Sequence, residues 1–302
     1  MSLSRWVLLL AFSGCLAAQT INYSYDAAGR LASVAYPNGK TLSYTYDANG
    51  NLLRRLITTP VTGAAPVASA AGVLNAASFG GGPVAPGELV TIFGTGIGPA
   101  TLANLQLTAF SFLGTLIGDT TVLFDGIPAP LVYASAGQTT AIVPYSVAGK
   151  TSTQMVVVYQ GRTSAPVTLP VTAAAPALFS ADSSGKGNGA ILNQDNSPNS
   201  PSNPAAKGSI VILFGTGEGQ TNPGGIDGRV ASTVFPKPLG SVKVTIGGIQ
   251  ADIAYSGAAP FLVAGVLQIN VTVPPGVASG AATVVVTVGS ASSQPGLTVA
   301  VQ

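Results

Sequence analysis

The sequence contains no histidine, one cysteine and few charged residues. Without histidine, the commonest general base and the commonest transition-metal ligand are both missing. A single cysteine excludes an internal disulfide and a cysteine-based zinc site. The 12 basic and 10 acidic residues give a formal net charge of +2. A nucleic-acid partner is not expected, because phosphate binding needs clustered lysine and arginine. We also expect no cofactor.

The chain instead has 38 glycines and 22 prolines among its 302 residues. Both residue types interrupt helices and favour turns, so helices have little room. Valine, isoleucine, threonine and tyrosine fill the stretches between them, which favours β-strands. The composition therefore predicts an all-β chain with frequent turns.

Residues 1–18 have the layout of a secretory signal peptide. Arg5 precedes a short apolar run at residues 6–12, and small residues lead to Ala18. We expect cleavage after Ala18 and export of the chain. The alternative is a lipoprotein, because the residues up to Cys15 resemble a bacterial lipobox and cleavage there would free a thiol for lipid attachment. No run reaches the ~20 apolar residues of a transmembrane helix, so no span is expected.

Residues 19–59 contain two similar boxes that lie 21 residues apart. Each box is a Tyr-Asp pair followed by glycine, and the boxes consist of Tyr25, Asp26 and Gly29 and of Tyr46, Asp47 and Gly50. An aspartate that begins a turn can accept backbone N–H bonds, and glycine tolerates the left-handed conformation that follows. Asn38-Gly39 lies between the boxes and is a strong hairpin signal. The pattern predicts short antiparallel strands joined by tight turns.

This pattern resembles the YD repeats of Rhs-type and teneurin-like secreted proteins over residues 22–56. In that family, many such repeats wind into a large β-shell around a cargo. Two repeats cannot enclose a cargo, so the resemblance implies the local fold without encapsulation. We expect the tyrosines to pack across the strands as a small core. The alternative is that Tyr25 and Tyr46 belong to an aromatic face that contacts sugar or cell wall.

Residues 60–72 are small, uncharged and spaced by proline, which predicts an extended linker. The rest of the chain contains one pattern twice, at residues 86–96 and 207–217: a turn, an apolar strand and a Gly-Thr-Gly corner. Elsewhere, alternating apolar and polar residues predict half-buried antiparallel sheets. We therefore predict two tandem immunoglobulin-like β-sandwiches, at residues 73–175 and 176–302, preceded by the short YD-repeat β-hairpin segment.

The two corners contain Gly94 and Gly96 in the first copy, and Gly215 and Gly217 in the second. We interpret all four as structural turn glycines. Gly94 and Gly215 are predicted to have a positive φ, where alanine is disfavoured. The corners lack the G-x-G-x-x-G spacing and a following helix, so they do not predict a nucleotide-binding loop.

The order of these motifs resembles the IPT/TIG immunoglobulin-like domain. GVLNAASF at residues 72–79, LVYASAGQ at 131–138 and GVLQINV at 265–271 resemble more closely an uncharacterised C-terminal domain of secreted, Solibacter-type Acidobacterial proteins. That resemblance covers roughly residues 72–302. Members of the family carry this domain behind varied repeat or enzyme domains. The resemblance therefore implies an accessory, anchoring or surface-display role.

The sequence contains no recognisable catalytic arrangement. A serine nucleophile would lack its usual histidine base, and the acidic residues form no recognisable pair. Glu218, Asn222 and Asp227 could offer oxygen ligands to Ca²⁺, but that ion takes about six to eight of them. A solvated loop, or a surface contact between Asp227 and Arg229, is therefore favoured over a metal site.

These observations together predict a non-enzymatic, secreted module for cell-surface display, adhesion or assembly. Its partner would be a protein or glycan at the cell surface. A module that binds extracellular polysaccharide is the alternative. An accessory part of a secreted hydrolase is the least favoured interpretation, because the usual catalytic residues are missing.

Overall fold

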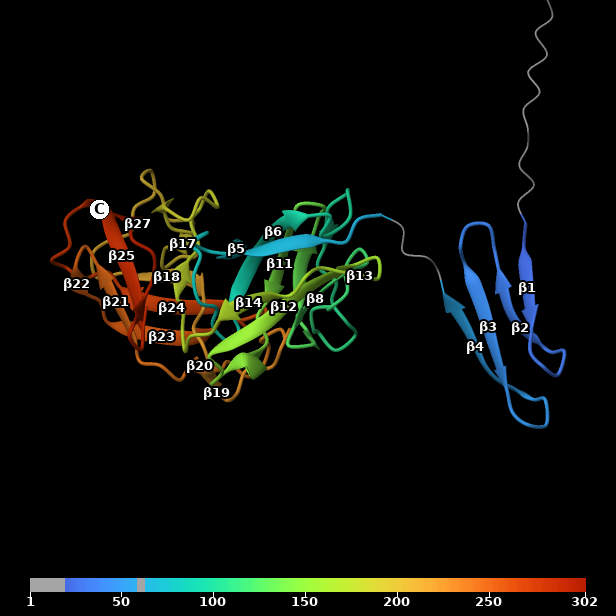
Figure 1. Ribbon diagram of the computed structural model, residues 1–302. Coiled ribbons are helices and arrows are strands. Elements are labelled where there is room, and N and C mark those ends of the chain that lie inside the picture. The colour runs from blue at the N-terminus through green and yellow to red at the C-terminus, as the bar shows by residue number, and fades with distance from the viewer. Residues whose placement is uncertain (1–19, 59–62) are drawn as a thin grey trace, which may run out of the picture. The chain divides into compact units, whose positions relative to one another are not determined.

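The computed structural model describes residues 20–58 and 63–302. Apart from one short 3-10 helix at Tyr145–Val147, every regular element in these residues is a β-strand. The predicted fold class, an all-β chain with two tandem immunoglobulin-like β-sandwiches after a short hairpin segment, is confirmed (Figure 1). The chain forms two compact units, Met1–Gly63 and Ala64–Gln302. The predicted signal peptide, with Cys15, lies outside the described residues.

The first unit contains one antiparallel four-stranded sheet in the order β1-β2-β3-β4. Its strands are β1 Asn22–Tyr25, β2 Leu31–Ala35, β3 Thr41–Tyr46 and β4 Leu52–Thr58. Tyr23, Val34, Leu42 and Ile57 are paired in one row across the sheet. Directly paired residues point to the same face, so this row forms an apolar face. The neighbouring row, which contains paired serines, points to the opposite face.

The first sandwich of the second unit is built from two sheets. One sheet has the order β5-β6-β11-β10-β7, and the other has the order β13-β12-β8-β9 with β14 also paired to β12. The strands are β5 Val67–Asn75, β6 Leu89–Thr95, β7 Ala103–Asn104, β8 Thr120–Phe124, β9 Ile127–Pro128, β10 Leu131–Ala134, β11 Gln138–Ile142, β12 Ser152–Tyr159, β13 Arg162–Thr163 and β14 Val167–Pro170.

The second sandwich has sheets in the orders β15-β18-β24-β23 and β16-β27-β25-β21-β22, with β17 paired to β18 and β26 to β25. A separate two-stranded sheet, β19-β20, comes between β18 and β21 in the sequence. The strands are β15 Ala177–Leu178, β16 Gly187–Asn188, β17 Ile191–Leu192, β18 Ile210–Thr216, β19 Thr221–Asn222, β20 Lys237–Pro238, β21 Val242–Ile246, β22 Ile249–Gln250, β23 Ile253–Ala258, β24 Leu267–Thr272, β25 Gly280–Val288, β26 Ala291–Ser292 and β27 Leu297–Val301.

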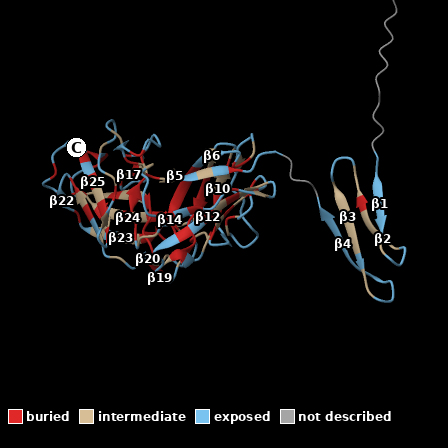
Figure 2. Cartoon of the chain, viewed as in Figure 1, coloured by how far each residue is buried: buried red, intermediate tan, exposed pale blue. Residues whose placement is uncertain are grey.

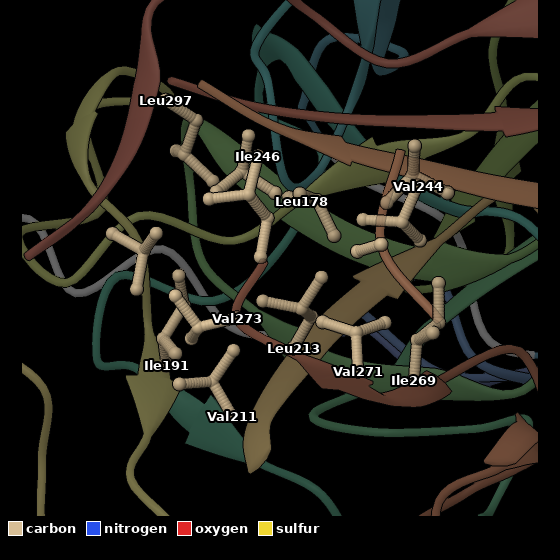
Figure 3. Close-up of a cluster of buried hydrophobic side chains, with 14 of the residues drawn as sticks. Leu178, Ile191, Val211, Leu213, Val244, Ile246, Ile269, Val271, Val273 and Leu297 are labelled. Carbon is tan, nitrogen blue, oxygen red and sulfur yellow. The ribbon is translucent and has the colours of Figure 1, made fainter. Parts of the chain in front are cut away.

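The two sandwiches share one strand order, which agrees with the repeat in the sequence. β6-β11-β10 of the first corresponds to β18-β24-β23 of the second, and β14-β12-β8-β9 corresponds to β27-β25-β21-β22. In each sandwich the two sheets enclose their own apolar core. Figure 3 shows the second core, where Leu213 and Val271 from one sheet face Val244 and Ile246 from the other. Alternating apolar residues on each strand supply these cores.

A third apolar cluster joins the two sandwiches into one unit. Its buried members come from both, and they are Leu89, Leu113, Ile142, Ala259 and Val266. The backbone N–H of Leu89 donates to the Thr216 hydroxyl at 2.9 Å, and this hydroxyl donates to the Gly265 carbonyl at 2.8 Å. The predicted boundary near residue 175 falls between β14 and β15, and buried contacts cross it.

The linker predicted at residues 60–72 is wrong in its second half. Residues from Val67 onward belong to β5, where Val67 pairs with Thr95 and Ala68 with Gly94 before the register shifts. The small residues in this stretch show no apolar alternation, so the sequence carries no strand signal there. The stretch is held as a strand by its pairing with β6.

Candidate functional site

The two YD boxes form nearly identical turns. Asp26 Oδ1 accepts backbone N–H bonds from Ala28 and Arg30 at 3.0 and 2.9 Å. Asp47 Oδ1 accepts the equivalent bonds from Asn49 and Asn51 at 2.9 and 2.8 Å. Hydrogen bonds from Arg30 lower the pKa of Asp26, and those from Asn51 lower the pKa of Asp47. The carboxylates therefore stay ionised and hold the turns.

The glycine of each box has the conformation that the motif predicts. Gly29 has a φ of 77° and Gly50 a φ of 89°. These values lie in the left-handed region, which an L side chain adopts only at a cost. Gly39, in the hairpin between the boxes, has a φ of 78°. The YD motif residues therefore have a structural role in this unit.

Arg30 links the two boxes, a role that the sequence reasoning missed. Its Nε donates to Asp26 Oδ2 at 2.7 Å, and its Nη1 donates to the Asp47 carbonyl at 3.0 Å. The guanidinium lies 4.8 Å from the centre of the Tyr46 ring. Asn51 is the equivalent residue of the second box and bonds only within its own box, to Asp47. The long basic side chain directly after the first box is the sequence feature from which this link could have been predicted.

The tyrosines of this sheet divide into two groups. Tyr36, Tyr44 and Tyr46 are half-buried, as a small cross-strand core requires. Tyr23 and Tyr25 are 57% and 63% exposed, and their strand, β1, has the colour of exposed residues in Figure 2. Tyr46 also donates its hydroxyl to the Leu31 carbonyl at 2.9 Å. Of the two tyrosines predicted as ligand contacts, Tyr25 is therefore free to meet a partner, whereas Tyr46 is engaged within the sheet.

The prediction of a positive φ at Gly94 and Gly215 is wrong. Both lie inside strands, β6 and β18, and the positive values belong to Gly96 at 63° and Gly217 at 81°. A Cβ on Gly94 would clash with the Val67 carbonyl oxygen, and one on Gly215 would clash with the Ala177 carbonyl oxygen. Glycine is therefore required at these two positions by the close approach of a neighbouring strand.

The three residues considered as calcium ligands differ in their burial. Asn222 is exposed, whereas Glu218 is only 2% exposed. Asp227 Oδ1 accepts the backbone N–H of Tyr145 at 2.8 Å, which ties this loop to the first sandwich. Within the described residues, no three His, Cys, Asp or Glu side chains form a group that could hold a metal. The expected solvated loop is wrong for Glu218, because this side chain is buried.

Glu218 lies in the wall of a cavity of about 460 Å³ in the second unit. The walls come from both sandwiches, and their apolar members include Ala148, Val171, Ala174, Leu239, Val288 and Ala291. Burial raises the pKa of Glu218 from 4.5 to about 8. Its Oε2 is buried and has no hydrogen-bond partner in the described part of the chain.

Glu88, the other deeply buried acid, has a different environment. It is also 2% exposed, and burial raises its pKa to about 8. However, Oε1 accepts from Asn75 Nδ2 at 2.8 Å, and Oε2 accepts from the Ala85 N–H at 2.7 Å. Asn75 Nδ2 also donates to the Ala175 carbonyl at 3.1 Å. Glu88 therefore has a structural role at the junction, whereas Glu218 has a free oxygen.

In residues 20–58 and 63–302, no helix has the length and apolar character that a membrane span needs.

A family model described as RHS Repeat matches residues 25–64, which include both YD boxes. No curated protein matches the sequence. The chain is similar to a crystal structure of the N-terminal eight immunoglobulin domains of Down syndrome cell adhesion molecule isoform 1.30.30. The identity is 10% and the TM-score 0.21, over 94% of this chain and 30% of that chain.

The chain is also similar to domains 4–9 of the surface layer protein SbsC. Here the identity is 18% and the TM-score 0.19, over 94% of this chain and 30% of that chain. This chain therefore spans about 30% of the length of either structure. The RHS match confirms the predicted YD-repeat resemblance of the first unit.

Proposed function

We propose that this chain is an extracellular, non-catalytic interaction module in which the YD sheet contacts a partner. The second unit would act as a stiff carrier, because its sandwiches share a buried cluster and hydrogen bonds. The proposal includes export by the N-terminal signal, with a lipid anchor at Cys15 as the alternative. The resemblance of residues 72–302 to IPT/TIG and Solibacter-type domains supports an accessory, display or adhesion role.

The observation that carries this proposal is the exposure of apolar side chains at both ends of the apolar row of the YD sheet. Tyr23 and Ile57, at opposite ends of the paired row, are 57% and 47% exposed. Val34 is the buried residue of the row, at 5% exposed. A sheet normally buries one face against another layer. Exposed apolar side chains that flank a buried one on a small sheet are typical of an interaction surface.

A binding assay with intact bacterial envelopes tests this role. The full chain is compared with a variant carrying Tyr23→Ser and Ile57→Ser on the apolar face. The matched control carries Ser24→Ala and Ser33→Ala, whose hydroxyls lie 2.7 Å apart on the opposite face. We expect the first variant to lose binding and the control to retain it. Equal binding by all three proteins would contradict the proposal.

Polysaccharide binding is a second candidate function, supported by the exposure of Tyr25. An exposed aromatic ring with a polar hydroxyl suits stacking on a sugar. Binding of the full chain to purified, protein-free polysaccharide, and its loss in Tyr25→Ala, would favour this role. Retained binding to envelopes without any binding to polysaccharide would favour a protein partner.

A further inference from the structure

The two YD boxes have the same backbone turn but different surroundings. In the second box, the guanidinium of Arg30 lies 4.8 Å from the centre of the Tyr46 ring, and Arg30 Nη1 donates to the Asp47 carbonyl at 3.0 Å. A Cβ on Gly50 would lie 3.9 Å from the same nitrogen. The ring, the carbonyl and the glycine of this box therefore form a receptor for one arginine side chain.

The first box presents the same three groups, which are Tyr25, the Asp26 carbonyl and Gly29. In the described residues, no guanidinium lies over the Tyr25 ring, and the Asp26 carbonyl accepts only the Gly29 N–H, at 2.9 Å. A Cβ on Gly29 would meet no atom within 4 Å. Tyr25 is correspondingly 63% exposed, whereas Tyr46 is half-buried. The arginine receptor is therefore accessible in the first box.

The sequence does not repeat the arginine before the first box. The boxes lie 21 residues apart, and the position 21 residues before Arg30 is occupied by Leu9. Arg5 is the only basic residue that precedes Arg30, and it lies in the predicted signal peptide. An arginine for the first box would therefore come from another polypeptide.

The strand edge beside the first box is open as well. β1 lies at one end of the strand order and pairs only with β2 in the described part of the chain (Figure 1). Arg30 directly precedes β2, which pairs antiparallel with β3, and the second box begins at the last residue of β3. This pairing brings the arginine of one strand to the box of its neighbour. A strand added to the free edge of β1 would bring its arginine to the first box in the same way.

We propose that β1 and the first box bind an extended, arginine-containing segment of a partner protein. The segment would pair with β1 as an added strand, and its guanidinium would stack on Tyr25 and donate to the Asp26 carbonyl. Arginine suits this site better than lysine, because a planar guanidinium can stack on a ring while it donates hydrogen bonds. The inference names a partner chemistry for the YD sheet, and so it rests on the proposed interaction role of that sheet.

A synthetic peptide with the sequence of residues 29–36 tests this recognition. It contains Arg30 and β2, the segment that fills the receptor of the second box within the chain. Two matched peptides carry Arg30→Gln or Arg30→Lys. Each peptide is titrated into the full chain, with binding followed by protein-observed NMR. We expect shifts at β1 and the first box, with the glutamine peptide binding about tenfold more weakly and the lysine peptide about threefold more weakly than the original.

Substitutions in the first box of the full chain separate the ring from the strand edge. Tyr25→Leu removes the aromatic face and should weaken binding of the original peptide about fivefold, whereas Tyr25→Phe should bind it within about twofold of the original affinity. Gly29→Asn tolerates a positive φ, but its side chain would fill the space beside the carbonyl and should weaken binding at least about tenfold. Ser33→Ala, on β2, is the control and should leave the affinity unchanged. The amide spectrum of the sheet confirms the fold of each variant.

Several results would overturn the inference. Equal affinity for the arginine and glutamine peptides would exclude recognition of the guanidinium. Shifts at β4 instead of β1, or binding that Tyr25→Leu leaves unchanged, would place the peptide elsewhere. No peptide binding at millimolar concentrations, with envelope binding that still depends on Tyr23 and Ile57, would refute this inference and leave the proposed interaction role intact. Peptide binding at β1, with equal envelope binding by all variants, would refute the role of the apolar row and support this inference.

Discussion

The buried carboxyl of Glu218 predicts a specific dependence of stability on pH. Its pKa is about 8 in the native protein against the ordinary value of 4.5. Between these values the native state holds a proton that the unfolded state releases, so the free energy of unfolding falls as the pH rises. The contribution is fully present below pH 4.5 and is lost as the pH rises through about 8.

The size of this effect follows from the two pKa values. At about 1.4 kcal/mol per pH unit, the difference between 4.5 and about 8 corresponds to about 5 kcal/mol. Glu88, with the same raised pKa, adds a contribution of the same sign. Both side chains are only 2% exposed, so solvent screens neither strongly. Glu218→Gln should therefore remove a large part of the pH dependence.

Urea unfolding followed by circular dichroism at pH 5, 7 and 9 measures this effect. The original chain should lose stability across the series, and Glu218→Gln should lose less and be the more stable protein at pH 9. Glu88→Gln is the matched comparison. It removes the same titration but also loses one hydrogen bond, a separate cost of about 1–3 kcal/mol, because an amide cannot accept from both Asn75 and Ala85. Equal pH slopes for the original chain and Glu218→Gln would refute the reasoning.

Two further predictions concern the strands and the YD turns. Gly94→Ala or Gly215→Ala should destabilise the second unit by about 3 kcal/mol or more through a clash with a neighbouring carbonyl. Gly96→Ala meets no atom within 4 Å and should cost only about 1–2 kcal/mol for its positive φ; similar losses at all three positions in chemical unfolding would be contrary evidence. Arg30→Ala should destabilise the YD sheet more than Asn51→Ala, because only Arg30 joins the boxes. Hydrogen exchange of the β1–β4 amides measures this, and an equal loss of protection in the two variants would disprove the link.

Local features of the chain could be predicted from the sequence. The YD turns depend on contacts within four residues, from Asp26 to Arg30 and from Asp47 to Asn51. Such contacts require particular residues at fixed positions, which can be recognised in the sequence. The alternation of apolar and polar residues in the strands of the sandwich cores can be recognised in the same way. The duplicated Gly-Thr-Gly corner likewise indicated two similar sandwiches, whose strand orders now agree.

Features that depend on distant segments could not be predicted in this way. Gly94 needs glycine because of Val67, and Gly215 because of Ala177, each on another strand. Glu218 lies in a glycine-rich polar stretch that is typical of a solvated loop, yet residues of the first sandwich help to bury it. Only the packing of the two sandwiches creates that environment.

The central claim is that the apolar face of the YD sheet meets the partner. Hydroxyl-radical footprinting of the full chain, free and bound to intact envelopes, tests it directly because tyrosine is a reactive reporter. The account predicts protection of Tyr23 and Tyr25, which are 57% and 63% exposed in the free chain. Protection confined to tyrosines of the second unit, such as Tyr159 and Tyr255, would contradict it.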